Sequence, residues 1–115
     1  MSKLNLDIGH NSATLNIAPE IYFRILQKAV LQTSEDLKQM EAALPQNDFT
    51  VIKAVSHKLK GDYDNLRISD LANIARAMDE MAKKEESNEG ILALLNDFAD
   101  YFDQLKKIVV QKESS

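Results

Sequence analysis

The segment NDFTVIKAVSHKLKGDYDNL, residues 47–66, carries the pattern that decides the fold of this chain. Apolar and small side chains recur in it at alternating steps of three and four residues, the spacing that helices use when they pack in bundles. Asn47 and Asp48 come before the run, and their side chains are typical helix N-caps. The segment therefore predicts an amphipathic helix that buries one face. The residues of that face are Phe49, Ile52, Ser56, Leu59, Tyr63 and Leu66.

Three further segments on either side show helical periodicity of the same kind. The first is expected to begin near Pro19, because proline lacks the N–H that a first helical turn leaves unpaired, and to end at Pro45. Another follows Ser69, which is its expected N-cap. The last begins near Ile91, after a polar connection at residues 83–90. Four amphipathic helices with short connections predict an all-α protein, an antiparallel four-helix bundle.

The bundle is expected to span residues 19–110. Residues 1–18 are interpreted as a polar lead-in, a short N-terminal arm that lies loosely on the domain. Residues 111–115 at the C-terminus are expected to fray. A chain of 115 residues is the size of one domain, and its three glycines and two prolines are too few for the many tight turns of an all-β fold.

Composition excludes several functional classes. The net charge of −4 disfavours nucleic acid as a partner, since affinity for phosphate backbones comes from clustered lysine and arginine. The chain has no cysteine, which rules out a disulfide, a thiolate metal site and a thiol nucleophile. No apolar run approaches the roughly 20 residues that cross a bilayer, and Met1 to His10 lacks the apolar core of a signal peptide. We therefore expect a cytoplasmic protein that does not enter the membrane.

The chain has two histidines, and their surroundings differ. His10 lies in the N-terminal arm with no partner nearby in sequence, so it is interpreted as an ordinary exposed residue. His57 directly follows Ser56, which puts it about 100° away from the centre of the buried face. It therefore lies on the flank of the predicted helix. The residues one turn away on that flank are Lys53, Lys60 and Gly61, with Asp64 one turn further.

Lys60 and Gly61 suit a histidine that receives a phosphoryl group. Glycine inside a helix costs about 1 kcal/mol relative to alanine, so a functional gain should offset it. Gly61 removes a side chain next to the imidazole and lets a partner surface approach. Lys60 places an ammonium group where a phosphoryl group on His57 would bring negative charge. The pattern indicates phosphoryl chemistry on the imidazole.

The hexapeptide SHKLKG, residues 56–61, resembles the signature of the histidine-phosphotransfer (HPt) family, a small residue followed by His-x-Leu-Lys-Gly. The resemblance covers residues 19–110. A short pattern alone can occur by chance, but here it lies in the middle of a predicted bundle helix. Other positions that fit the family pattern are Asp48, Leu66, Leu71, Met78 and Asp79.

The resemblance implies a role for four residues. His57 would accept the phosphoryl group through its Nε2 atom, and Lys60 would assist it electrostatically. Gly61 would give the partner access to the ring. Asp79, at the position of the polar residue that the family carries on its next helix, would hold the other ring nitrogen. The chain would then be a phosphoryl carrier rather than an autonomous enzyme.

The resemblance also implies the partners, which are receiver domains. The receiver of a hybrid sensor kinase would donate the phosphoryl group, and a response regulator would then accept it on its own aspartate. The receiver would supply Mg²⁺, so the chain itself is expected to need neither a cofactor nor a metal. It is expected to act as a monomer. Flank residues expected to contact a receiver are Lys53, Ala54, Lys58, Asp64 and Arg76.

Departures from the family pattern keep two alternatives open. Residues 62–64, Asp-Tyr-Asp, follow the glycine where the family has small residues, and Asp64 could repel a phosphoryl group. Arg67 replaces the glycine of the turn, and Asp79 is one methylene shorter than the usual Glu or Gln. These differences suit a degenerate HPt-fold adaptor that binds receivers without carrying phosphate. The other alternative is an unrelated bundle in which His57 is a surface histidine.

Acidic residues on the last predicted helix form a row, Asp97, Asp100 and Asp103. Two carboxylates three residues apart can share a cation, but no histidine or further ligand accompanies them. A bundle with a di-metal site would carry Glu-x-x-His pairs, which this chain lacks. The row is therefore interpreted as a solvated helix face, and no metal site is expected.

Overall fold

The computed structural model describes residues 2–85 and 88–115. These ranges hold helices and short connections, and no strand. One short helix precedes the bundle, four long helices form it, and a single turn of 3₁₀ helix lies between the first two of these. The bounds are α1 Ile8–Thr14, α2 Pro19–Ala43, η1 Leu44–Gln46, α3 Phe49–Asn65, α4 Ser69–Lys83 and α5 Asn88–Glu113.

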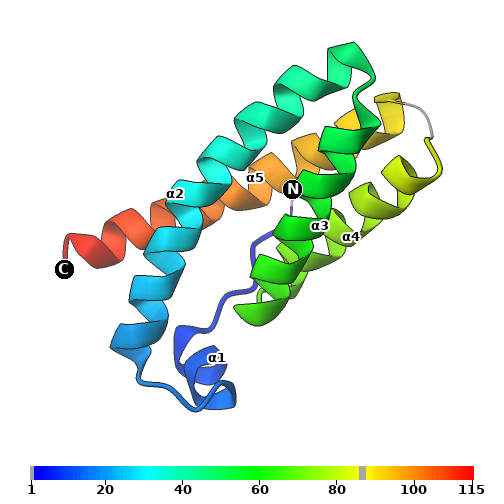
Figure 1. The fold of residues 1–115 in the computed structure, drawn as a ribbon. Helices are drawn as coiled ribbons and strands as arrows, with labels where there is room; N and C mark the ends of the chain where they lie inside the picture. Colours follow the sequence, from blue (N-terminus) through cyan, green and yellow to red (C-terminus); the bar gives the residue numbers. More distant parts are fainter. Residues whose placement is uncertain (1, 86–87) are drawn as a thin grey trace.

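Helices α2 to α5 form an antiparallel four-helix bundle (Figure 1). Each packs against the next in chain order, and α5 closes the bundle against α2. The C-terminal end of α5 extends past α3 and α4 (Figure 1). This architecture confirms the predicted fold class. None of the helices in residues 2–85 and 88–115 combines the length and apolar content that a membrane span requires.

Two of the four predicted helix starts are confirmed. α2 begins at Pro19, and η1 contains Pro45, where the first bundle helix was expected to end. Asp48 caps α3, since its side chain accepts a hydrogen bond from a backbone N–H of the first turn. The expected cap of α4 is wrong. Ser69 is the first helical residue, and the buried Ile68 takes the N-cap position without a side-chain hydrogen bond.

The polar connection expected at residues 83–90 is shorter than predicted. Lys83 is the last residue of α4, and α5 begins at Asn88. Lys83 extends the helix because its ammonium group pairs with Asp79, one turn earlier on the same face. Residues 86–87 of the expected connection lie outside the described part of the chain.

The N-terminal arm packs on the bundle instead of lying loosely on it. It contains α1, which the sequence analysis did not predict. Leu4 is buried, and its N–H donates to the Gln104 side chain on α5. Asn11 of α1 is also buried and donates to the Tyr22 hydroxyl on α2. At the other end, α5 continues to Glu113, within the segment expected to fray.

The core between the long helices includes a buried hydrogen bond. Tyr63 of α3 packs edge-on against Phe98 of α5, with ring centroids 5.9 Å apart. The Tyr63 hydroxyl lies 2.7 Å from Oγ1 of Thr33 on α2, and both side chains are fully buried. The face predicted for α3 is buried throughout, except for the half-buried Phe49. That face therefore fixes which residues of α3 remain on the surface.

Burial of Tyr63 predicts a loss of stability at alkaline pH. Desolvation raises the pKa of its hydroxyl well above the ordinary value, the hydrogen bond with Thr33 lowers it, and the charges of Asp62 and Asp36 raise it. Such a group stabilises the fold fully below its unfolded pKa, about 10 for tyrosine, and loses that contribution as the pH rises. Above that pH, the free energy of unfolding should fall by up to about 1.4 kcal/mol more per pH unit in wild type than in Tyr63→Phe. Urea unfolding at a series of alkaline pH values measures both slopes, and equal slopes would contradict the expectation.

Candidate functional site

The outer face of α3 carries His57. The residue before it, Ser56, is fully buried, and His57 lies about 100° further around the helix. Its side chain is 67% exposed. A partner can therefore reach the ring, while the buried face of α3 holds the helix in the core.

A buried carboxylate lies directly behind the ring. Asp79 comes from α4, next to the core residue Met78, and its side chain is only 3% exposed. Three nitrogen atoms surround its Oδ2: Lys83 Nζ at 3.2 Å, His57 Nδ1 at 3.6 Å and Lys60 Nζ at 4.0 Å. A buried carboxylate needs such partners, because an unpaired buried charge is strongly destabilising. The structure thus brings together His57, Lys60 and Asp79 and adds Lys83.

The position of Asp79 bears on which ring nitrogen can react. Nδ1 is the nitrogen next to the carboxylate, so the proton of a neutral imidazole is favoured there. Nε2 then keeps its lone pair. The arrangement can present a nucleophilic nitrogen at the surface, with two ammonium groups on the carboxylate behind the ring.

Lys83 is the site residue that the sequence analysis missed. Lys83 was expected in a polar connection, whereas it closes α4 in the structure. The step from Asp79 to Lys83 is four residues, which brings opposite charges together on one helix face. That spacing could have identified Lys83 if the predicted helix had been one residue longer.

Residues 24–108 match the family model of the Hpt domain, which is most of the chain. The chain belongs to the Hpt domain family. It is therefore a histidine-phosphotransfer protein of two-component signalling, and proteins of this family interact with receiver domains.

The Hpt fold is also supported by a solved structure. Histidine-containing phosphotransfer protein B (HptB) from Pseudomonas aeruginosa PAO1 matches with a TM-score of 0.81 and 22% sequence identity. The match covers 96% of this chain and 94% of that chain. At this identity the likeness shows the shared fold. A comparison with curated proteins found no match.

Gly61 of this Hpt domain lies one turn after His57 and is half-buried. A Cβ atom at this position would meet no other group within 4 Å. Packing inside the molecule therefore gives no reason for a glycine here. Because glycine has no side chain, no atoms project from this position beside the ring, and a partner can come close to His57.

Lys58 of the Hpt domain is paired with side chains on the α2 side of α3. Its Nζ atom lies 2.7 Å from Asp36 Oδ2 and 3.6 Å from Asp62 Oδ2. Asp36 is buried in α2, so this ion pair links α2 to α3 beside the core. Lys58, expected to contact a receiver, is thus engaged within the protein. Asp36 was not among the site residues predicted from the sequence.

On the opposite flank, an ion pair connects α3 to α4. Arg76 Nη2 lies 3.1 Å from Asp64 Oδ2. The arginine balances the carboxylate that was expected to repel a phosphoryl group. Lys53 is half-buried and Ala54 exposed, one turn before His57 on α3.

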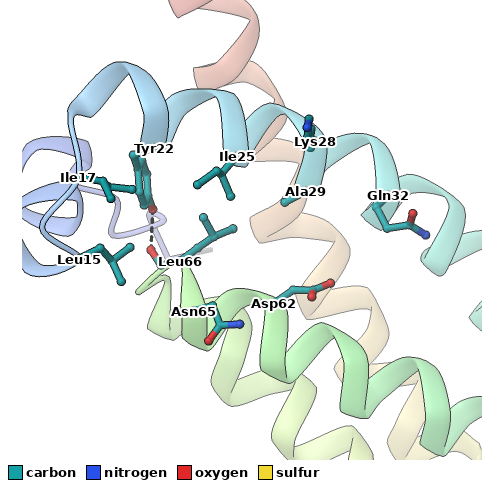
Figure 2. A pocket seen from close by; sticks show the side chains of 10 residues that line it. All are labelled: Leu15, Ile17, Tyr22, Ile25, Lys28, Ala29, Gln32, Asp62, Asn65 and Leu66. Carbon is teal, nitrogen blue, oxygen red and sulfur yellow. Dashed lines mark hydrogen bonds between the residues drawn. The ribbon is translucent and has the colours of Figure 1, made fainter.

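A groove opens between α2, the end of α3 and the chain after α1 (Figure 2). Its volume is about 550 Å³, within the range of ligand-binding sites. Figure 2 shows Ile25 and Leu66 facing each other across it, with Lys28 on one rim and Asp62 on the other. We call it the α2–α3 groove. Its other lining residues are Leu15, Ile17, Tyr22, Ala29, Gln32 and Asn65.

The acidic row on α5 lies at the surface. Asp97 and Asp103 are exposed and Asp100 is half-buried, and Asp103 pairs with Lys106 at 3.2 Å. Across the part of the chain that the structure describes, no group of three acidic or histidine side chains could hold a metal ion.

Proposed function

We propose that His57 is a phosphoryl acceptor and that the chain, as a cytoplasmic monomer, carries the group between two receiver domains. The receiver of a hybrid kinase gives the group to His57, and a response regulator then takes it. The observation that carries this proposal is the buried Asp79 carboxylate beside Nδ1 of an exposed histidine. It supports a ring whose other nitrogen is free to attack phosphorus.

All bonds that form and break in the proposed transfer lie between this chain and the receiver. The lone pair of His57 Nε2 attacks the phosphorus atom of the receiver's aspartyl phosphate, and an N–P bond forms. The P–O bond to the receiver's aspartate breaks, and the aspartate leaves as a carboxylate with the electron pair. The Nδ1 proton stays on the ring, where Asp79 stabilises the positive charge. Attack by the second receiver's carboxylate reverses these changes and restores the neutral imidazole.

Electrostatic assistance comes from both proteins. In this chain, Lys60 follows His57 by three residues on the same helix, and its charge would stabilise the negative charge that the phosphoryl group brings. Gly61 leaves room for the receiver's aspartate to reach the ring. The receiver supplies Mg²⁺ and its own acidic cluster, so the carrier itself needs no cofactor.

We further propose that the receiver docks an exposed helix in the α2–α3 groove. Apolar side chains such as Ile25 and Leu66 suit a helix that lays its apolar face into a groove. Asp62 and Asn65 of the groove follow His57 on the same helix by one to two turns, so a protein seated there also reaches the ring. Lys28 has no ion pair among the described residues, so its charge is available to an acidic side chain of the docked receiver.

The adaptor alternative has one observation in its favour. Lys83 Nζ lies nearer to Asp79 Oδ2 than His57 Nδ1 does. The carboxylate therefore pairs with another group besides the ring. An adaptor of this kind would bind receivers and carry no phosphate.

Incubation with a panel of phosphorylated receivers separates the two functions. We expect at least one receiver to transfer label to the chain, and the label to be acid-labile and stable in base, as a phosphoramidate is. Binding of receivers without transfer from any of them would contradict the carrier function and support the adaptor.

A further inference from the structure

Asp79 holds two ammonium groups in addition to the imidazole. Lys83 Nζ is the nearest, 3.2 Å from Oδ2, and Lys60 Nζ is 4.0 Å from the same atom. His57 Nδ1 also contacts this oxygen, at 3.6 Å. One carboxylate oxygen therefore contacts both ammonium groups and Nδ1 of the ring.

The Lys83 side chain is mobile enough to leave Asp79 for another anion. Its side chain is 58% exposed, and it stands at the C-terminal end of α4. A lysine carries its charge on a long flexible stem, and an ion pair with this exposure is weak. A stronger anion close by can therefore draw the ammonium group away. Asp79 would keep Lys60 and the His57 ring as partners.

Phosphorylation of His57 supplies such an anion, since a phosphoryl group brings between one and two negative charges near neutral pH. We propose that Lys83 moves its ammonium group from Asp79 to the phosphoryl group on His57 and stabilises the phosphorylated state together with Lys60. This inference rests on the proposed function of His57. It makes Lys83 a second phosphoryl-binding lysine, and one that comes from α4 rather than α3.

A purely structural lysine would behave differently. A cation in the last turn of a helix interacts with the helix dipole, and its pairing with an acid one turn earlier stabilises the helix. Removing such a lysine changes the free energy of unfolding and leaves the properties of a bound phosphoryl group unchanged.

The phosphoryl group itself can report on Lys83. The whole chain is phosphorylated with phosphoramidate, a small donor that needs no receiver, and the pKa of the phosphoryl group is measured by ³¹P NMR. A nearby cation favours the dianion and lowers this pKa. We expect Lys83→Gln to raise it by roughly 0.2–0.7, and Lys83→Arg to restore it. The equilibrium with a phosphorylated receiver should shift about two- to fivefold toward the receiver in Lys83→Gln.

Lys84→Gln is the matched control. Lys84 is the next residue, exposed, with no ion pair among the described residues, so its loss removes the same charge without reaching the phosphoryl group. A pKa that is the same in wild type, Lys83→Gln and Lys84→Gln would overturn the role of Lys83. Failure of phosphoramidate and of every receiver to label His57 is a separate result, and it would overturn the proposed function itself.

Discussion

Replacing His57 with Gln is expected to abolish phosphoryl labelling of the chain. Glutamine keeps a polar side chain on α3 but has no ring nitrogen that can form an N–P bond. The His57 side chain is largely exposed, and Lys83 still pairs with Asp79, so the free energy of unfolding should change by less than about 0.5 kcal/mol. Label transfer from phosphorylated receivers and a urea unfolding curve for each protein provide the two measurements.

His10→Gln is the control for this experiment. His10 is the other histidine of the chain, and it lies exposed on α1. The variant should take up label as wild type does. If the label survives in His57→Gln and disappears in His10→Gln, the acceptor has been assigned to the wrong histidine.

The four bundle helices could be predicted because each buries one face at steps of three and four residues. The face of α3, from Ile52 to Leu66, is the clearest case. α1 could not be predicted in this way. It has seven residues, and a helix so short depends on partners elsewhere in the chain. Those partners, such as Tyr22 for Asn11, are visible only once the fold is known.

The site shows the same division between local and distant contacts. Lys60 was predicted beside His57 because three residues make nearly one helical turn. Asp79 followed only from the family resemblance, since its approach to the ring depends on how α3 and α4 pack. The Asp36–Lys58 pair and the α2–α3 groove also depend on contacts between helices. The spacing of residues within one helix therefore could not predict them.

Replacing Ile25 with Glu is expected to weaken receiver binding about tenfold or more. Ile25 lies on α2, 45% exposed, across the α2–α3 groove from Leu66 (Figure 2). A docked apolar helix would strip water from the new carboxylate and leave its charge unpaired. The fold should tolerate the change, because the side chain is already partly in water. Affinity for unphosphorylated receivers, measured by titration calorimetry, tests the expectation.

Leu31→Glu separates the groove from the rest of α2. Leu31 is on the same helix, 73% exposed and outside the groove, so the same substitution there should leave the affinity near that of wild type. The competing surface is the α3–α4 flank that carries the Asp64–Arg76 pair. If Arg76→Ala weakens binding and Ile25→Glu does not, the receiver docks on that flank and the groove is the wrong surface. If both weaken it, the receiver covers α3 from the groove to the flank. That outcome keeps the groove in the interface, because His57 lies between the two surfaces and the receiver's aspartate has to reach it.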